Sequence, residues 1–156
     1  MAAKEKNHYT KILIRQGILS PDQLREAEHM TRQAGMKLQD TLVRLGYATN
    51  EEVVRALAEQ HSLDYVDLNE VLIPASVVEL VPESVARENC VLPLSEEDGM
   101  LKIIASAPAD LDTVEKLRFI LNRRIETALA PRDAILVAIN RLYGQTVGVS
   151  ADSMLQ

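Results

Sequence analysis

In the first sixty residues, apolar positions recur at the spacing of an amphipathic helix, in two stretches that repeat each other. One stretch reads RQGILSPDQLREAEHMTRQ (15–33) and the other reads RLGYATNEEVVRALAEQ (44–60). Gly17 and Gly46 lie 29 residues apart within them. The repeat predicts two copies of one unit, made of a helix, a glycine turn and a second helix.

The residues around these glycines carry signals for helix ends. Glycine takes the left-handed conformation at little cost, so Gly17 and Gly46 are each predicted to end a helix. Ser20 and Thr49 are each followed three residues later by Gln or Glu, which is the capping-box pattern that begins a helix. We therefore predict four helices in two pairs over residues 1–62.

After His61 the pattern changes to short apolar or alternating runs separated by turn residues, which is typical of strands. Asp98-Gly99 separates two of these runs and predicts a hairpin. The predicted strands cover residues 63–68, 90–94, 100–106 and 124–130. The predicted helices cover residues 74–80, 82–88, 111–121 and 131–143, and Gly144 is predicted to end the last of them.

Together these elements predict an α+β protein. A helical subdomain of two helix-turn-helix repeats covers residues 1–62, and a small α/β subdomain with a short mixed sheet covers residues 63–144. Residues 145–156 show no periodicity, and we interpret them as a tail or linker.

The amino-acid composition indicates the cellular compartment of the protein. The 47% of hydrophobic residues suffices for a core, but no apolar run is long enough to span a membrane, and the N-terminus lacks the apolar region of a signal peptide. The single cysteine, Cys90, suits a reducing compartment. These features favour a cytoplasmic protein without membrane insertion.

The net charge of the chain indicates which classes of binding partner to expect. The net charge is −6, whereas a general nucleic-acid binder presents a basic face to the phosphates. Arg123-Arg124 is the one adjacent pair of basic residues in the sequence. Nucleic acid is therefore not an expected partner. The net charge does not exclude a local binding site for a small anion.

Motifs of catalysis are missing from the sequence. No Gly-x-x-x-x-Gly-Lys-Ser/Thr loop is present in the 156 residues, so we do not expect ATPase activity from this chain. His8, His29 and His61 are too far apart in sequence for a metal-ligand motif. The sequence predicts no enzyme, no metal and no required cofactor.

Three segments carry a resemblance to a known family: the turn at 46–49, ALAEQHSLDYVDL (56–68) and APADLDTVEKLRF (107–119). In this order they resemble the N-terminal domain of type II secretion and type IV pilus assembly ATPases. The resemblance implies a helical subdomain followed by a small α/β subdomain. It also implies a non-catalytic adaptor upstream of a motor domain, docking on the cytoplasmic part of an inner-membrane platform protein and peripheral to the membrane through that partner.

The alternative implied by the family is a receptor for cyclic di-GMP, which some members bind through two tandem motifs beginning Arg-Leu-Gly. The positions that the resemblance assigns to this ligand are Thr10, Leu13, Gly17, Leu24, Lys37, Leu38, Gln39, Leu42, Gly46, Val53, Leu57 and Gln60. His8-Tyr9-Thr10 stands in place of the first Arg-Leu-Gly, and Lys37 and Gln39 replace Arg and Gly in the second. Ala107 replaces an acid of the family's Ala-Asp-Pro loop. Lysine lacks the planar fork of arginine, so these changes predict weak or undetectable binding.

A docking surface is expected on the helical repeat. Four short helices need only part of their surface for their own core, and apolar residues left over in one patch mark an interface. The candidates are Tyr9, Ile12, Met30 and Leu38. The alternative is that all four pack internally.

Overall fold

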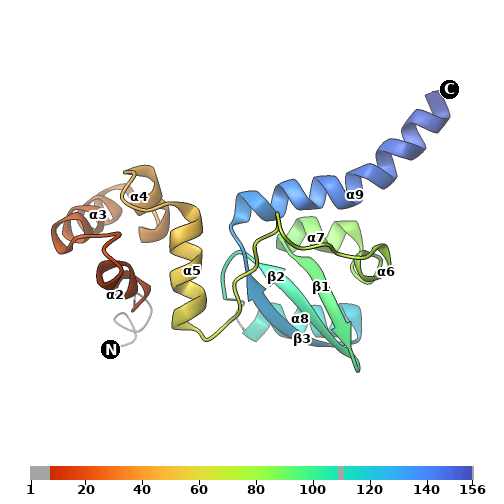
Figure 1. The fold of residues 1–156 in the computed structure, drawn as a ribbon, viewed down its shortest axis with the longest axis horizontal. Coiled ribbons are helices and arrows are strands. Elements are labelled where there is room, and N and C mark those ends of the chain that lie inside the picture. The colour runs from red at the N-terminus through yellow and green to blue at the C-terminus, as the bar shows by residue number, and fades with distance from the viewer. Residues whose placement is uncertain (1–7, 109–110, 156) are drawn as a thin grey trace. The chain divides into compact units, whose positions relative to one another are not determined.

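The structure, a computed structural model, describes residues 8–108 and 111–155. The chain divides into two compact units, with the division between Leu63 and Asp64. Figure 1 shows both units with their helices and strands labelled. We call them the helical unit and the α/β unit and describe each by itself.

The helical unit contains the four predicted helices. They are α2 (His8–Arg15), α3 (Pro21–Ala34), α4 (Leu38–Arg44) and α5 (Asn50–Gln60). Helix α2 packs against α5, and α3 packs against α4. Apolar side chains from the helices and from the two glycine turns are buried here, among them Leu13, Leu19, Leu42, Ala48 and Leu57.

The helix ends form as the sequence predicts. Ser20 Oγ accepts a hydrogen bond from the Gln23 amide at 3.1 Å, and the Gln23 side chain accepts one from the Ser20 amide at 3.0 Å. The second repeat has the same reciprocal pair, in which Thr49 Oγ1 accepts from the Glu52 amide at 3.1 Å and Glu52 Oε1 accepts from the Thr49 amide at 2.9 Å. Both predicted capping boxes are confirmed.

We expect Thr49→Ala to lower the free energy of unfolding of the helical unit by about 1 kcal/mol, because the amide at the start of α5 loses its partner. Urea denaturation followed by circular dichroism measures the change. Thr49→Ser keeps the accepting oxygen and serves as the matched control. Equal stability of the alanine variant and the wild type would show that the cap contributes nothing.

Within its described residues, the α/β unit contains a three-stranded sheet with four helices around it. The elements in chain order are α6 (Ala75–Val78), α7 (Glu83–Asn89), β1 (Leu92–Glu97), β2 (Met100–Ala105), α8 (Leu111–Leu121), β3 (Arg124–Leu129) and α9 (Arg132–Leu155). The strand order is β1-β2-β3, with β1 antiparallel and β3 parallel to β2. The predicted mixed sheet and the α+β class are therefore confirmed.

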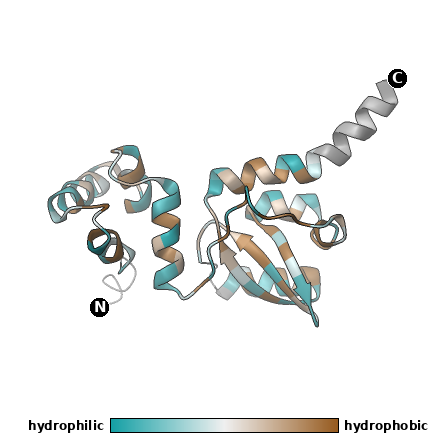
Figure 2. Ribbon diagram, viewed as in Figure 1, coloured by the Kyte–Doolittle hydropathy of each residue, from teal (hydrophilic) through white to brown (hydrophobic). Residues whose placement is uncertain are grey.

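The β1–β2 hairpin turns at Asp98 and Gly99, which both have positive φ (51° and 79°). This is the backbone that an Asp-Gly turn between two strands adopts. Hydrophobic residues line the part of the hairpin away from this turn, and hydrophilic residues gather near it (Figure 2). Leu92, Leu101, Ile103 and Ile104 of the two strands are completely buried.

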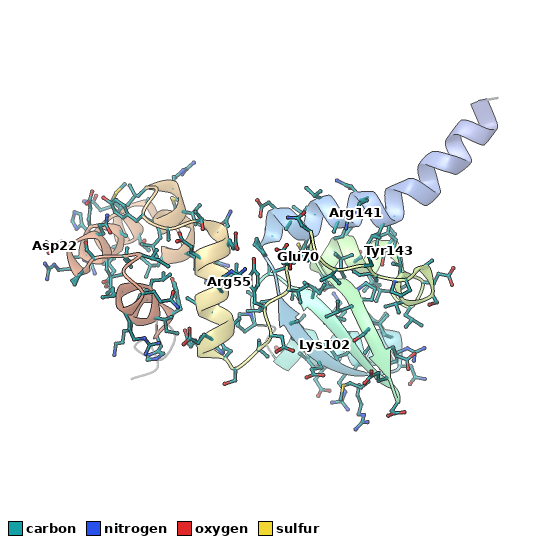
Figure 3. All side chains as sticks on the ribbon, in the orientation of Figure 1. Asp22, Arg55, Glu70, Lys102, Arg141 and Tyr143 are labelled. Atoms are coloured by element: carbon teal, nitrogen blue, oxygen red, sulfur yellow. The ribbon has the colours of Figure 1, made fainter. Side chains whose placement is uncertain are left out.

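Helices cover the sheet and complete the core. Helix α8 packs against β3, and α9 packs against β2 and α7. The fully buried Leu117, Ile135 and Ile139 come from these helices. Tyr143 of α9 donates its hydroxyl to the carbonyl of Val81 at 2.7 Å and lies beside α7 (Figure 3). The carbonyl of Val78 lies 3.3 Å from the same hydroxyl, so Tyr143 ties α9 to the α6–α7 segment.

The predicted strand at 63–68 is wrong. Only Tyr65 makes a β-bridge, to Leu129, flanked by hydrogen bonds from the Leu129 amide to the Asp64 carbonyl and from the Val66 amide to the Leu129 carbonyl, both at 2.8 Å. Pairing stops there because Asp67 starts a turn, in which its side chain accepts from the Asn69 amide at 2.9 Å. Alternation alone did not reveal this turn.

The predicted helix end at Gly144 is also wrong, whereas the interpretation of residues 145–156 as a tail or linker stays a prediction. Helix α9 continues to Leu155. Gly144 has no positive φ, in contrast to Gly17, Gly35, Gly46 and Gly99. A helical glycine costs about 1 kcal/mol relative to alanine, which lowers helix propensity without forcing a stop.

Candidate functional site

The two glycine turns of the helical unit have the same geometry. Gly17 and Gly46 both have a φ of 77°. The residue that follows each glycine donates its amide to a carbonyl of the preceding helix. The Ile18 amide donates to the Leu13 carbonyl and the Tyr47 amide to the Leu42 carbonyl, both at 3.0 Å. Apart from each glycine and its two chain neighbours, no atom lies within 4 Å of where a Cβ would stand, so their backbones are open on one side.

Polar contacts join the two repeats to each other. The Tyr9 amide at the start of α2 donates to Gln60 Oε1 at the end of α5, at 2.8 Å. Between α3 and α4, Thr31 Oγ1 donates to Thr41 Oγ1 at 2.9 Å, and Thr41 Oγ1 donates to the Lys37 carbonyl at 3.1 Å. Thr31 therefore occupies in the first repeat the place that Gln60 occupies in the second, with a shorter side chain.

The twelve candidate ligand residues fall into three groups by burial. The completely or nearly buried ones are Thr10, Leu13, Leu42, Val53 and Leu57. The half-buried ones are Leu24, Leu38, Gln39 and Gln60, and the exposed ones are Gly17, Lys37 and Gly46. The structure thus places Leu13, Leu42, Val53 and Leu57 in the core of the helical unit and leaves Gly17, Lys37 and Gly46 exposed.

The docking candidates are corrected by the structure. Tyr9 and Ile12 are only 1% and 2% exposed, so neither lies on a surface that a partner can reach. Their spacing with Leu13 is that of one helix face, and this signal in the sequence favoured burial. Met30 is 39% exposed and Leu38 is half-buried. Met30 is the exposed member that remains.

The hydroxyl of Tyr9 is buried and has no hydrogen-bond partner among the residues that the structure describes. Burial raises the pKa of Tyr9, and the nearby Asp40 carboxylate raises it further. Tyr9 therefore stays protonated and neutral, and its ring fills the space between the helices.

Ala107 belongs to the connection between β2 and α8. Ser106, Ala107 and Pro108 are described, whereas residues 109 and 110 lie outside the described residues. Ala107 carries no polar side chain that could bind a guanine edge.

Among residues 8–108 and 111–155, no group of three or more His, Cys, Asp or Glu side chains is placed to hold a metal ion. In the same part of the chain, no helix combines the length and the apolar character needed to cross a membrane.

Comparison with known proteins identifies the family. The MshEN domain model matches residues 61–149, which is more than half of the chain. The chain belongs to the MshEN domain family. The match covers the α/β unit, so the MshEN domain identity rests on the part of the chain with the sheet.

Relatives of this MshEN domain are much longer proteins. The chain is 26% identical to the type IV pilus assembly ATPase PilB of Myxococcus xanthus over 86% of its own length and 24% of the relative. It is 30% identical to PilB of Thermus thermophilus, over 84% of the chain and 15% of the relative. The bacteriophage adsorption protein B of Escherichia coli is 26% identical, over 93% of the chain and 19% of the relative. The chain spans about a quarter or less of each.

Solved structures confirm the fold. A structure of MshE with cdg (cyclic di-GMP) superposes with a TM-score of 0.75 at 32% identity, over 86% of this chain and 98% of that one. The N-terminal domain of XpsE superposes with a TM-score of 0.67 at 22% identity, over 88% and 94% of the two chains, which supports the fold alone. The resemblance to the N-terminal domain of secretion and pilus ATPases is confirmed.

Proposed function

We propose that this MshEN domain is a non-catalytic adaptor and regulatory domain of a type II secretion or type IV pilus assembly ATPase, and that it docks the motor on its inner-membrane platform. The observation that carries the proposal is that 84–86% of the chain aligns with only 15–24% of two pilus assembly ATPases. A motor of this class needs a phosphate-binding loop. Because the 156 residues contain no such motif, we assign ATP hydrolysis to a downstream domain in the cytoplasm.

On the helical unit, the proposal assigns docking to the outer side of α3. Met30 is exposed there although it is apolar, and its neighbours His29, Arg32 and Gln33 are also exposed. A flexible thioether on a polar surface is suited to an interface that must fit a partner. Tyr9 and Ile12 take no part, since they hold α2 in the core.

Met30→Glu tests this assignment. We expect the change to reduce co-purification of the platform protein's cytoplasmic part at least about tenfold, because a buried, unpaired carboxylate opposes the interface. Gln16→Glu adds the same charge at an exposed position of the helical unit outside α3 and is the matched control. Equal loss in both variants, or no loss in either, would move the docking surface away from Met30.

The second candidate function is that of a cyclic di-GMP receptor controlling the motor. It is favoured by the 32% identity to MshE, whose structure contains cdg, over 98% of that chain. Gly17, Gly46 and Gln60 remain in place in this chain. The replaced residues at 8–10, 37, 39 and 107 argue for weak binding, so we rank this candidate second.

A further inference from the structure

A pocket of about 480 Å³ opens on the α/β unit where the end of α8 meets the start of β3 and the β1–β2 turn. The residues lining it are Gly99, Glu115, Arg118, Phe119, Asn122, Arg123 and Arg124. The connection that contains Ala107 follows the opposite end of β2. The pocket is therefore separate from the loop that the family resemblance assigns to cyclic di-GMP.

Positive charge is concentrated at this pocket in an otherwise acidic chain. The net charge of the protein is −6, yet Lys116, Arg118, Arg123 and Arg124 fall within nine residues. Three of these four side chains line the pocket. Arginine is the side chain best suited to bind carboxylates, because its planar guanidinium donates two parallel hydrogen bonds.

These arginines are available to a ligand. Arg118 lies 3.4 Å from Glu115 and Arg123 lies 3.4 Å from Glu96, both at the long end for an ion pair. The Arg118–Glu115 pair is exposed to water, and such pairs contribute little and exchange readily, whereas the Arg123–Glu96 pair is half-buried. The Arg124 side chain makes no ion pair or hydrogen bond within the described part of the chain.

An exposed aromatic ring stands beside the arginines. Phe119 is the single phenylalanine of the chain and is 90% exposed, although most phenylalanines of folded proteins are largely buried. Its neighbour Ile120 is 45% exposed. An apolar ring next to guanidinium groups suits a ligand that carries both carboxylates and apolar side chains.

The free edge of β3 begins at the pocket. The Arg124 amide donates to the Gly99 carbonyl at 3.1 Å and the Ala130 amide to the Ala105 carbonyl at 3.0 Å, so these residues face β2. The Leu129 amide points the other way, to Asp64. Because successive residues of a strand alternate in direction, the amides of Ile125 and Thr127 also point away from β2. Among the described residues, pairing on this side is limited to the bridge at Leu129.

We propose that the arginine pocket and the free edge of β3 together bind an extended, acidic segment of a partner protein. The segment adds as a strand alongside Ile125 and Thr127, and its carboxylates reach Arg118, Arg123 and Arg124. Backbone hydrogen bonds along an open edge provide affinity and the arginines select for acidic residues. A small anion such as a nucleotide would use the pocket but not the edge. The proposal is independent of the proposed function.

The test uses the full 156-residue chain and a fluorescein-labelled peptide of alternating threonine and valine residues ending in a run of aspartates. We expect this peptide to bind at least about tenfold more tightly than a matched peptide ending in asparagines, as measured by fluorescence anisotropy. The amide signals of Ile125 and Thr127 in a nitrogen-15 spectrum are expected to shift on binding.

Two variants separate the two parts of the site. Replacing Arg118, Arg123 and Arg124 by glutamine is expected to abolish the preference for the aspartate peptide. The matched control replaces Arg132 and Arg141, which are exposed on α9, by glutamine. Thr127→Pro is expected to abolish binding of both peptides while leaving the sheet intact, because the lost amide points away from β2.

The proposal is overturned if the two peptides bind equally, or if the control pair weakens binding as much as the arginine variant. It is also overturned if ATP competes with the peptide while the amides of Ile125 and Thr127 do not shift. That last result would identify a site for phosphate-bearing small molecules.

Discussion

Cyclic di-GMP is expected to bind this chain with no better than micromolar affinity, and the double variant Lys37→Arg/Gln39→Gly is expected to bind it roughly ten- to a hundredfold more tightly. Lys37 is exposed at the start of α4, so an arginine there has room to stack on a guanine or to bind a phosphate with its planar fork. A good bidentate contact to a base contributes about 1–3 kcal/mol. Glycine at 39 removes a half-buried side chain where the family resemblance implies a close approach of the backbone to the ligand.

Titration calorimetry of the wild type, the double variant and a control measures this effect. Lys11→Arg makes the same chemical change at another exposed lysine of the helical unit and is expected to leave the affinity unchanged. A sub-micromolar dissociation constant for the wild type would contradict the account, because the residues at 8–10, 37, 39 and 107 would then suffice. Such a result would promote the receptor to the leading function.

Above pH 10 the α/β unit is expected to lose roughly 2 kcal/mol of stability through Tyr143. The pKa of Tyr143 is raised to about 12, chiefly by burial and secondly by the Glu83 carboxylate. Because the folded-state pKa lies above the unfolded value of 10, the stabilisation is complete below pH 10 and disappears as the pH rises to about 12.

Tyr143→Phe isolates this contribution. At neutral pH the variant is expected to be less stable by about 1 kcal/mol, since the hydrogen bond to the Val81 carbonyl is lost. Near pH 12 it is expected to be the more stable protein, because it has no hydroxyl to ionise. Urea denaturation at a series of pH values measures both curves, and curves that stay parallel would show that Tyr143 does not titrate as described.

The elements that the sequence predicts correctly are those with local signals. Capping boxes at Ser20 and Thr49 and the turn at Asp98-Gly99 involve residues within a few positions of each other, so the pattern of side chains is sufficient. The end of pairing after Tyr65 depends on the Asp67 turn, and the continuation of α9 through Gly144 depends on the backbone there being helical. Neither follows from alternation or from the presence of a glycine.

The sequence predicted the backbone turns of the candidate site better than it predicted which side chains are exposed. The glycine turns follow from the repeat, whereas the apolar candidate positions come from the family resemblance alone. Burial of Tyr9 and Ile12 depends on α2 packing against α5, a contact between residues about fifty positions apart. The arginine pocket forms because the register of β2 and β3 brings Gly99 close to Arg118 and Arg124. The sequence does not reveal this register, so it showed only the adjacent pair of arginines at 123–124.

The central claim, that this MshEN domain is a docking adaptor of a secretion or pilus motor, is tested most directly by one binding measurement. The purified chain is titrated by calorimetry with the cytoplasmic part of the inner-membrane platform protein encoded in the same genome. The account predicts saturable binding that is weakened by Met30→Glu and retained by Gln16→Glu. Absence of binding between the two folded proteins would contradict it.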